Sequence, residues 1–201
     1  MTRSFYLLGA PGVGKSTVMR EMLRPWNVGE YVRLTEREMF GHHLYDAPRD
    51  YKGVYLGHLR PEFPGTDALS MSVQPEAIKW LRHDDGGQDF IFGEGARLGN
   101  AAFLEELALR STLTIVLLTA DPETVEARLQ ARPDSGDHKT GRTGRSQDKK
   151  WREGQATRCR NAVEKMAPLL STNPRLSIIE IATDQPGATP PILAAVILGA
   201  S

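Results

Sequence analysis

Four short apolar runs lie along the chain, each bounded by glycine, proline or polar residues. They are SFYLLG from Ser4, DFIFGEG from Asp89, LTIVLLTA from Leu113 and LSIIEIAT from Leu176. Near-continuous apolar runs of this length are typical of parallel strands that are buried on both faces. The pattern therefore predicts four central strands, and EYVRLTER (residues 30–37) is a candidate for a fifth.

Segments with helical spacing separate these runs. They are STVMREML (16–23), NAAFLEELAL (100–109) and DPETVEARLQAR (121–132). In the third segment Asp121 is the expected N-cap, and Pro122 suits the first turn. The apolar PILAAVILGA (191–200) is too short to span a bilayer and is expected to be a helix packed on the sheet. Strands that alternate with helices predict one α/β domain over residues 1–201, built as a three-layer sandwich.

Two segments do not follow this alternation. Residues 40–75 mix aromatics, histidine, proline and glycine, with candidate hairpin strands at HHLYD (42–46) and GVYLG (53–57). Residues 133–147 (PDSGDHKTGRTGRSQ) are polar, rich in glycine and basic. Insertions at the ends of strands are where α/β proteins place their ligand-binding groups. We therefore expect residues 40–75 to bind the substrate and residues 133–150 to form a lid.

Composition narrows the choice of partners only a little. The 25 Lys and Arg residues balance the 25 Asp and Glu residues, so no chain-wide field favours nucleic acid or a membrane surface. Residues 128–160, however, carry ten Lys/Arg against four Asp/Glu, which makes this segment positive on a mildly acidic body. Cys159 is the only cysteine, so no intrachain disulfide can form and a reducing, cytoplasmic location is expected. The first ten residues do not have the form of a signal peptide.

The residues GAPGVGKST fit the P-loop pattern G-x-x-x-x-G-K-[ST], between a predicted strand and a predicted helix. The glycines let the backbone curl so that successive N–H groups face inward at the positive end of a helix, where they hold a polyphosphate. Lys15 can reach the outer phosphates, and the Ser16 hydroxyl can bind Mg²⁺. The predicted nucleotide-binding residues are Gly9, Ala10, Pro11, Gly12, Val13, Gly14, Lys15, Ser16 and Thr17.

This motif, then DFIFGEGARL, TADPETVEARLQAR and GRTGR, occur in an order that resembles the P-loop kinases of the nucleoside and nucleotide kinase superfamily. The resemblance implies a five-stranded parallel sheet in the order 2-3-1-4-5, a substrate-binding insertion and an arginine-bearing lid. It also implies ATP as donor, with Mg²⁺, and adenine bound between the lid and the loop IATDQPG. No N-K-x-D motif for guanine is present, which argues against a regulatory GTPase. A nucleotide-hydrolysing switch is the second hypothesis.

Glu94 lies near the end of the second run and would stand at the carboxyl edge of the sheet, beside the P-loop. There its carboxylate can order Mg²⁺ or accept the proton of an attacking hydroxyl. Arg97 can hold the acceptor's phosphate or steady the transferred group. In the superfamily that the chain resembles, an acidic residue at this strand end commonly has such roles. The alternative is that Glu94 caps the following helix and pairs with Arg97.

The predicted lid carries two arginines, Arg142 and Arg145, beside the glycines of GRTGR. Guanidinium groups on such a loop can fold over the triphosphate and offset charge in the transition state. The alternative is an ordinary solvated basic loop. Further cations that could assist follow in the next predicted helix: Lys149, Arg152 and Arg158.

Residues 40–75 give only partial information about the acceptor. Asp67 can hydrogen-bond or activate a base or sugar hydroxyl, or it can equally be the N-cap of DALSMS. No Cys/His spacing indicates zinc, so the only metal expected is the Mg²⁺ carried with the nucleotide. Rings suited to stacking on a base are His42, His43, Tyr45, Tyr55 and His58.

Several acceptors fit a kinase with these features. The segments GTDALSM and KWREGQATRCRN resemble phage-type kinases that phosphorylate the hydroxymethyl group of 5-hydroxymethyluracil in DNA. That resemblance implies a flipped base, a basic strip for the flanking backbone and a location in the host cytoplasm. The alternatives are a free nucleoside or nucleoside monophosphate, or a polar small molecule such as a sugar or an antibiotic. The positive segment 128–160 suits a DNA strip and an ATP lid equally well.

Overall fold

A computed structural model describes residues 1–60, 64–83, 87–131 and 149–199. At its centre these residues form a seven-stranded sheet in the order β2-β3-β4-β5-β1-β6-β7. The strands are β1 (Arg3–Leu8), β2 (Asn27–Arg33), β3 (Phe40–Asp46), β4 (Tyr51–Leu56), β5 (Phe90–Glu94), β6 (Thr112–Thr119) and β7 (Leu176–Ala182). The helices are α1 (Lys15–Leu23), α2 (Val73–His83), α3 (Ala101–Arg110), α4 (Pro122–Gln130), α5 (Lys149–Met166) and α6 (Pro190–Gly199), with short 3₁₀ helices η1 (Thr66–Ala68) and η2 (Ala167–Ser171).

The strands do not all run in one direction. β4, β5, β1, β6 and β7 pair in parallel, whereas β3 is antiparallel to both β2 and β4. The α/β architecture is confirmed, but the sheet is mixed and has seven strands, so the predicted five-stranded parallel sheet is not matched in detail. The two additional strands come from the β2–β3–β4 meander at one end of the sheet.

The strand beside β5 is the main correction to the sequence prediction. EYVRLTER supplies part of β2, which ends at Arg33 and lies at the edge of the sheet. β4 is instead the strand that pairs in parallel with β5, with Tyr55 opposite Phe92. It comes from the expected substrate-binding insertion, and Val54 and Leu56 in it are completely buried. Its apolar run is short and preceded by Tyr-Lys-Gly, so periodicity alone marked it as a hairpin strand.

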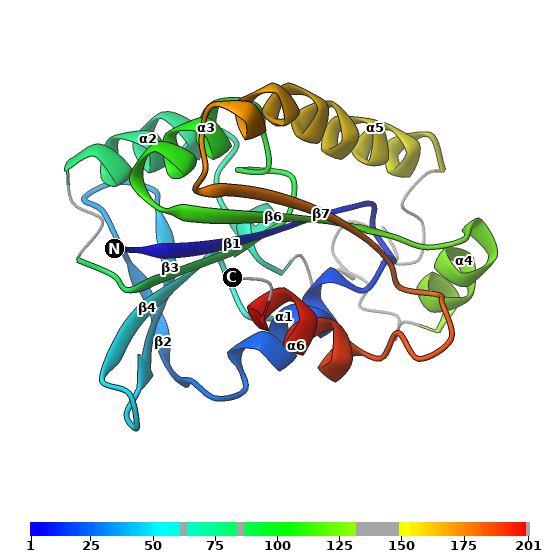
Figure 1. Cartoon of the computed structure of the whole chain (residues 1–201), viewed down its shortest axis with the longest axis horizontal. Coiled ribbons are helices and arrows are strands. Elements are labelled where there is room, and N and C mark those ends of the chain that lie inside the picture. The colour runs from blue at the N-terminus through cyan, green and yellow to red at the C-terminus, as the bar shows by residue number, and fades with distance from the viewer. Residues whose placement is uncertain (61–63, 84–86, 132–148, 200–201) are drawn as a thin grey trace, which may run out of the picture.

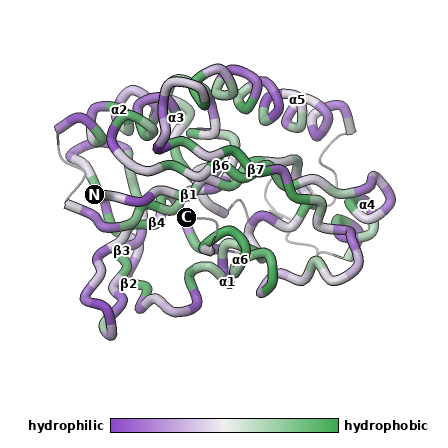
Figure 2. Tube along the Cα trace, in the orientation of Figure 1, coloured by the Kyte–Doolittle hydropathy of each residue, from purple (hydrophilic) through white to green (hydrophobic). Residues whose placement is uncertain are grey.

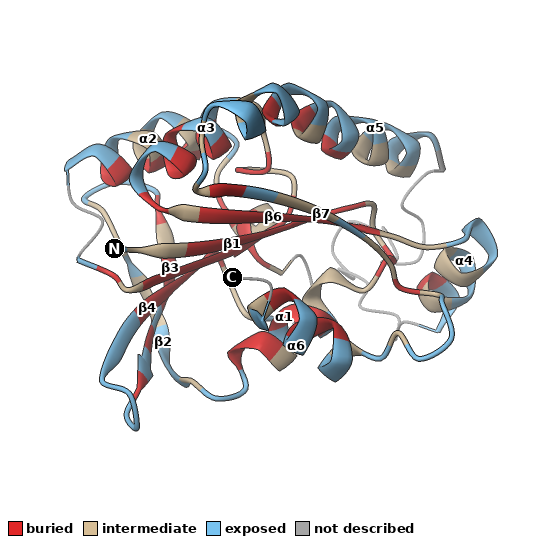
Figure 3. Ribbon diagram, in the orientation of Figure 1, coloured by how far each residue is buried: buried red, intermediate tan, exposed pale blue. Residues whose placement is uncertain are grey.

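The sheet lies between two layers of helices (Figure 1). α2, α3 and α5 cover one face, and α1 and α6 cover the other. The central strands are buried on both faces, as Figure 3 shows, and two hydrophobic clusters fill the spaces between the layers. Hydrophobic residues line β1, β6, β7 and α6, whereas α5 carries many hydrophilic residues (Figure 2). This arrangement explains the near-continuous apolar runs in the sequence.

Local signals place the helix starts close to where the sequence predicts them. Asn100 is the N-cap of α3, and its side chain accepts a hydrogen bond of 3.3 Å from the Phe103 amide. Asp121 occupies the N-cap position of α4, but its side chain makes no capping bond. The Asp121 amide instead donates to Asp184 Oδ2 at 3.0 Å, which ties the start of α4 to the loop after β7.

β1 lies between β5 and β6, and this position decides where the site can form. The chain that leaves β1 enters α1, whereas the chain that leaves its neighbour β5 leads to α3 in the opposite layer. In parallel α/β sheets, ligands bind at the carboxyl ends of the strands where the connections diverge in this way. The loop between β1 and α1, residues 9–14, lies at this point.

Candidate active site

The loop of residues 9–14 has the backbone conformation that the P-loop motif requires. Gly9, Gly12 and Gly14 all have positive φ angles, of 140°, 92° and 96°. A Cβ on Gly9 would collide with the carbonyl oxygen of Leu118, so this position also needs glycine for close packing against β6. α1 begins at Lys15, immediately after Gly14, so the positive end of the helix dipole is directed at the loop.

Lys15 and Ser16 lie where a bound triphosphate would need them. The Lys15 ammonium donates hydrogen bonds to the carbonyl oxygens of Gly9 and Ala10, at 2.8 and 3.0 Å, so it lies over the loop. The Ser16 hydroxyl donates a hydrogen bond of 3.0 Å to Glu94 Oε2, at the end of β5. The first turn of α1 thus places a cation and a hydroxyl beside the P-loop.

Glu94 ends β5 and is only 1 % exposed. Its Oε1 accepts a 2.9 Å hydrogen bond from the Tyr55 hydroxyl, and its Oε2 accepts the bond from Ser16. Burial raises the pKa of this carboxyl group, while the charge of Lys15 and the two hydrogen bonds oppose that rise. One interpretation of the sequence made Glu94 the cap of the following helix. The structure contradicts it, because the N-cap of α3 is Asn100.

The surroundings of Ser16 and Glu94 suit a magnesium ion. Mg²⁺ prefers oxygen ligands, above all carboxylates and phosphate oxygens, and it commonly keeps several waters. A hydroxyl and a carboxylate only 3.0 Å apart, next to a phosphate-binding loop, provide such donors. The residues present therefore fit the metal that the kinase resemblance implies.

Asp67 and Arg97 lie beside this centre. Asp67 is part of η1, whose N-cap is Gly65, so its side chain does not cap its own segment. Its Oδ1 instead accepts hydrogen bonds from the amides of Ala96 and Arg97, at 2.9 and 3.1 Å. The Nε atom of Arg97 is buried and has no hydrogen-bond partner among the described residues. Asp67 thus holds the backbone of the loop that carries Arg97.

The five rings predicted to stack on a base fall into three groups. Tyr55 is buried against Glu94. His58 stacks on Tyr31 at 4.2 Å between ring centroids, and His42 lies beside both. His42 accepts from the Leu59 amide at Nε2, so its Nδ1 carries the proton and donates to the Gly29 carbonyl. The remaining two, His43 and Tyr45, are exposed on β3.

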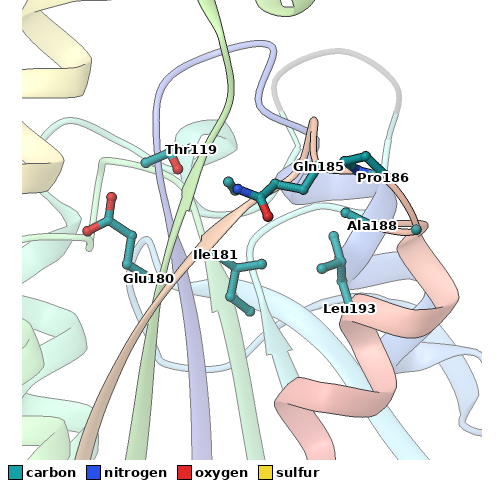
Figure 4. A pocket seen from close by; sticks show the side chains of 9 residues that line it. Thr119, Glu180, Ile181, Gln185, Pro186, Ala188 and Leu193 are labelled. Atoms are coloured by element: carbon teal, nitrogen blue, oxygen red, sulfur yellow. The ribbon is translucent and has the colours of Figure 1, made fainter.

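A shallow cleft of about 530 Å³ lies on the opposite side of the P-loop, at the ends of β6 and β7. Figure 4 shows the Gln185 side chain extending from the loop after β7 toward Thr119, above Ile181. Thr183 bridges the cleft and the P-loop by hydrogen bonds. Its hydroxyl donates to the carbonyl oxygen of Val13 in the P-loop at 2.9 Å and to that of Thr119, which lines the cleft, at 3.1 Å. It is lined by Thr119, Glu180, Ile181, Ala182, Gln185, Pro186, Gly187, Ala188 and Leu193.

Comparison with known proteins decides the family. The model of the P-loop Nucleotide Kinase3 family matches residues 1–192. The chain belongs to this family. It is therefore a P-loop phosphotransferase, and as a kinase of this family it binds a nucleotide. No curated protein matches the chain.

Among solved structures, the chain is similar to an unliganded sugar kinase from Janibacter sp. HTCC2649. The two share 14 % sequence identity, with 99 % of this chain and 95 % of the other covered, and a TM-score of 0.46.

Of the helices in the described ranges of the kinase, none has the length and apolar character needed to cross a membrane.

The predicted lid of the kinase lies almost entirely outside the described residues, and with it Arg142 and Arg145. α5 follows it and lies in the same layer as α2 and α3. Its buried Cys159 thiol lies 3.7 Å from the Gly9 carbonyl oxygen of the P-loop. Arg152 forms an ion pair of 2.9 Å with Glu126 of α4, whereas Arg158 is exposed. Burial raises the pKa of Cys159, which is consistent with an inert packing residue.

Sequence reasoning missed one pair of residues in the kinase, Arg128 and Thr183. The Arg128 guanidinium donates to the Thr183 hydroxyl at 2.8 Å and to the Val13 carbonyl at 3.4 Å, so α4 is fastened to the P-loop. Arg128 lies within a predicted helix among other charged residues, and nothing in its spacing distinguishes it. Arg128 reaches the P-loop because α4 packs against it, with Val125 and Leu129 close to Gly12.

Proposed function

We propose that this kinase transfers the γ-phosphoryl group of ATP to a hydroxyl group of a nucleotide-type acceptor. The acceptor that we favour is the hydroxymethyl group of 5-hydroxymethyluracil in DNA. One observation carries the kinase chemistry: a P-loop with Ser16 hydrogen-bonded to Glu94, between a cleft on one side and the Asp67–Arg97 loop on the other. The choice of DNA is supported by the sequence resemblance of GTDALSM and KWREGQATRCRN.

On the donor side, the P-loop amides and Lys15 would hold the β- and γ-phosphates. Ser16 and Glu94 would hold Mg²⁺, which supplies charge neutralisation at the phosphate oxygens when it is bound. The adenine would occupy the cleft beside Thr119 and Gln185, which is connected to the P-loop through Thr183. Transfer of a phosphoryl group depends mainly on positioning and charge, and this arrangement provides both.

On the acceptor side, cationic and aromatic groups suit a nucleotide. Arg97 has a buried donor without a partner in the described part of the chain, which fits a phosphate or the transferred group. The charge of Arg60 acts on the Tyr31–His58 stack, where burial and then this charge lower the pKa of His58. The role predicted for Arg142 and Arg145, neutralisation of the triphosphate, remains a prediction from the sequence.

Replacing Lys15 with alanine tests the donor half. Removal of one charged contact to the phosphates is expected to lower turnover at least ~100-fold, because such contacts act mainly in the transition state. The measurement is transfer of labelled phosphate from ATP, with circular dichroism to show that the fold is intact. Arg24→Ala is the matched control, because Arg24 is an exposed cation at the end of the same helix and should leave turnover unchanged. Unaltered activity in Lys15→Ala would exclude the P-loop from the mechanism.

A panel of acceptors tests the other half. Labelled ATP is incubated with 5-hydroxymethyluracil DNA, thymine DNA, mononucleotides, sugars and no acceptor. Label in hydroxymethyluracil DNA but not in thymine DNA supports the proposed acceptor. Label confined to mononucleotides or sugars would assign the kinase to that substrate class instead. Hydrolysis to water that no acceptor stimulates would indicate a nucleotide-hydrolysing switch.

A further inference from the structure

Two carboxylates border the reaction centre, and their hydrogen bonds differ. Both oxygens of Glu94 already receive donors, Tyr55 on Oε1 and Ser16 on Oε2, and the side chain is buried. Asp67 is half-buried and receives donors on Oδ1 only. No donor from the described ranges of the chain reaches its Oδ2.

The position of Asp67 is fixed from several sides. Oδ1 is held by the amides of Ala96 and Arg97, and the preceding Thr66 donates through its hydroxyl to the Glu94 carbonyl at 2.9 Å. A Cβ added to Gly95 would lie only 3.0 Å from Asp67 Oδ2, which shows how closely this carboxylate approaches the end of β5. Asp67 is therefore a rigidly held carboxylate with one oxygen available.

Asp67 also lies close to the P-loop. Its negative charge contributes to raising the pKa of Glu94 and of Cys159. The Cys159 thiol in turn lies 3.7 Å from the carbonyl oxygen of Gly9, the first residue of the P-loop motif. The geometry agrees: a Cβ on Gly65, two residues before Asp67, would collide with the Glu94 side chain, and Glu94 accepts from Ser16 beside the P-loop.

We propose that Asp67 is the catalytic base of the kinase, and that Glu94 serves the metal side of the site together with Ser16. This inference rests on the proposed kinase function. In the transfer step the acceptor hydroxyl oxygen forms a bond to the γ-phosphorus while its O–H bond breaks, and the proton goes to Asp67 Oδ2. The bond from the γ-phosphorus to the β–γ bridging oxygen breaks, and its electron pair leaves with ADP. Asp67 then releases the proton to solvent.

Glu94 is less suited to this task for a geometric reason. Each Glu94 oxygen already accepts one hydrogen bond, and the side chain is only 1 % exposed, so an acceptor hydroxyl would have to crowd or displace Ser16 or Tyr55 to reach it. Displacing Ser16 would also remove a metal-side contact, and displacing Tyr55 would leave its hydroxyl buried without a partner. Asp67 Oδ2 can accept a proton without breaking any hydrogen bond that is present.

A pair of substitutions at Asp67 separates the base from a mere loop anchor. Asp67→Asn keeps an oxygen that can accept from Ala96 and Arg97 but cannot take up the proton. Asp67→Ala removes both abilities. Single-turnover transfer from labelled ATP to a 5-hydroxymethyluracil oligonucleotide should fall ~10²- to 10⁴-fold in Asp67→Asn, the usual contribution of a general base. Its thermal midpoint and its affinity for a Mg²⁺-bound ATP analogue should match the wild type, whereas Asp67→Ala should also lose stability.

Asp89→Asn is the matched control for this pair. Asp89 precedes β5 at its other end, and its Oδ2 accepts a 2.9 Å hydrogen bond from the Lys52 amide, so it is also a carboxylate that anchors backbone. Its substitution should leave the transfer rate unchanged. A transfer rate in Asp67→Asn within a few-fold of the wild type, with a loss confined to Asp67→Ala, would overturn the proposal and leave Asp67 as an anchor.

Binding measurements keep this inference separate from the proposed function. Mg²⁺ should strengthen binding of the ATP analogue in the wild type and in Asp67→Asn, but much less in Glu94→Gln. The reverse result would overturn the assignment of the two carboxylates. If the wild type transfers no label to the oligonucleotide, the proposed acceptor fails, and hydrolysis to water takes over as the readout. A fall of ~10-fold or more in Asp67→Asn then supports the base, and an unchanged rate contradicts it.

Discussion

Glu94 and Glu106 are both buried glutamates, yet the protein treats their charges in opposite ways. Glu106 on α3 is 6 % exposed and accepts from the guanidinium groups of Arg82, at 2.7 and 2.9 Å, and of Arg110, at 3.1 Å. The hydrogen bonds from Arg82 lower the pKa of Glu106. Glu94 at the end of β5 has only neutral hydroxyl donors, and burial raises its pKa.

Under the proposed function, this difference separates a structural carboxylate, Glu106, from one that takes part in the reaction, Glu94. The charge of Glu106 is neutralised within the protein, so it fastens α2 to α3 and offers nothing to a ligand. The charge of Glu94 has no cation bonded directly to it in the described residues, although Lys15 acts on it from nearby. A buried carboxylate without a bonded cation destabilises the fold, and a metal-bound nucleotide can supply the missing positive charge.

The largest expected effect is on activity. Glu94→Gln should lower the single-turnover rate of phosphoryl transfer by ~10²- to 10³-fold, because it removes a preorganised charge at the metal side of the site. Glu106→Gln should leave the rate within about twofold, since Glu106 lies in the helical layer. Equal losses in the two variants would show that burial of a carboxylate, rather than its place at the P-loop, determines activity.

The next largest effect is on stability, which Glu106→Gln should lower and Glu94→Gln should not. Glu106→Gln should lower the free energy of unfolding at pH 7 by ~1–3 kcal/mol, because charge-assisted hydrogen bonds are lost. Glu94→Gln should leave stability unchanged or raise the melting temperature by a few degrees, because a buried charge is replaced by a neutral amide. Thermal unfolding of both variants beside the wild type measures this.

Acidification should reduce both stability differences from the wild type. The deficit of Glu106→Gln and the gain of Glu94→Gln should each become smaller as the pH falls. The pKa of Glu106 is lowered on folding, so its stabilisation is present above its ordinary pKa and is lost as pH falls through the folded-state value. The pKa of Glu94 is raised on folding, so its ionised form destabilises above the folded-state value. That penalty disappears as pH falls toward the ordinary value. If the difference in melting temperature between Glu94→Gln and the wild type stays constant across the acid range, the prediction for Glu94 is wrong.

The smallest effect is expected from Tyr55→Phe. The phenol donates to Glu94 Oε1 and holds the pKa of Glu94 down, so its loss should raise that pKa further. Transfer should fall ~10-fold, the effect of about 1.4 kcal/mol, because one hydrogen bond to a charged group is lost. The acid limb of the rate–pH profile should move to higher pH. Tyr45→Phe is the control, since Tyr45 donates to Asp50 on the exposed side of β3. An unshifted acid limb would show that Tyr55 only fills space.

The local patterns of the sequence were sufficient for the P-loop and for most of the regular elements. The four apolar runs overlap β1, β5, β6 and β7, and GAPGVGKST forms the loop after β1 and the start of α1. Such features depend on neighbouring residues: the spacing of glycines, a run of apolar side chains, a proline in the first turn of a helix. The roles assigned to Arg97, Arg142 and Arg145 are still predictions.

Contacts between residues far apart in the chain account for what the sequence could not show. β4 became a partner of β5 because burying Val54 and Leu56 beside the sheet outweighed the weak pattern of its segment. Tyr55 meets Glu94 across 39 residues, and Asp67 meets Ala96 across 29. No periodicity encodes such pairs, because each depends on the register of parallel strands and on where their ends meet. The sequence by itself predicted a P-loop for a nucleotide, and only the tertiary structure showed which oxygen of which carboxylate accepts no hydrogen bond from the described residues.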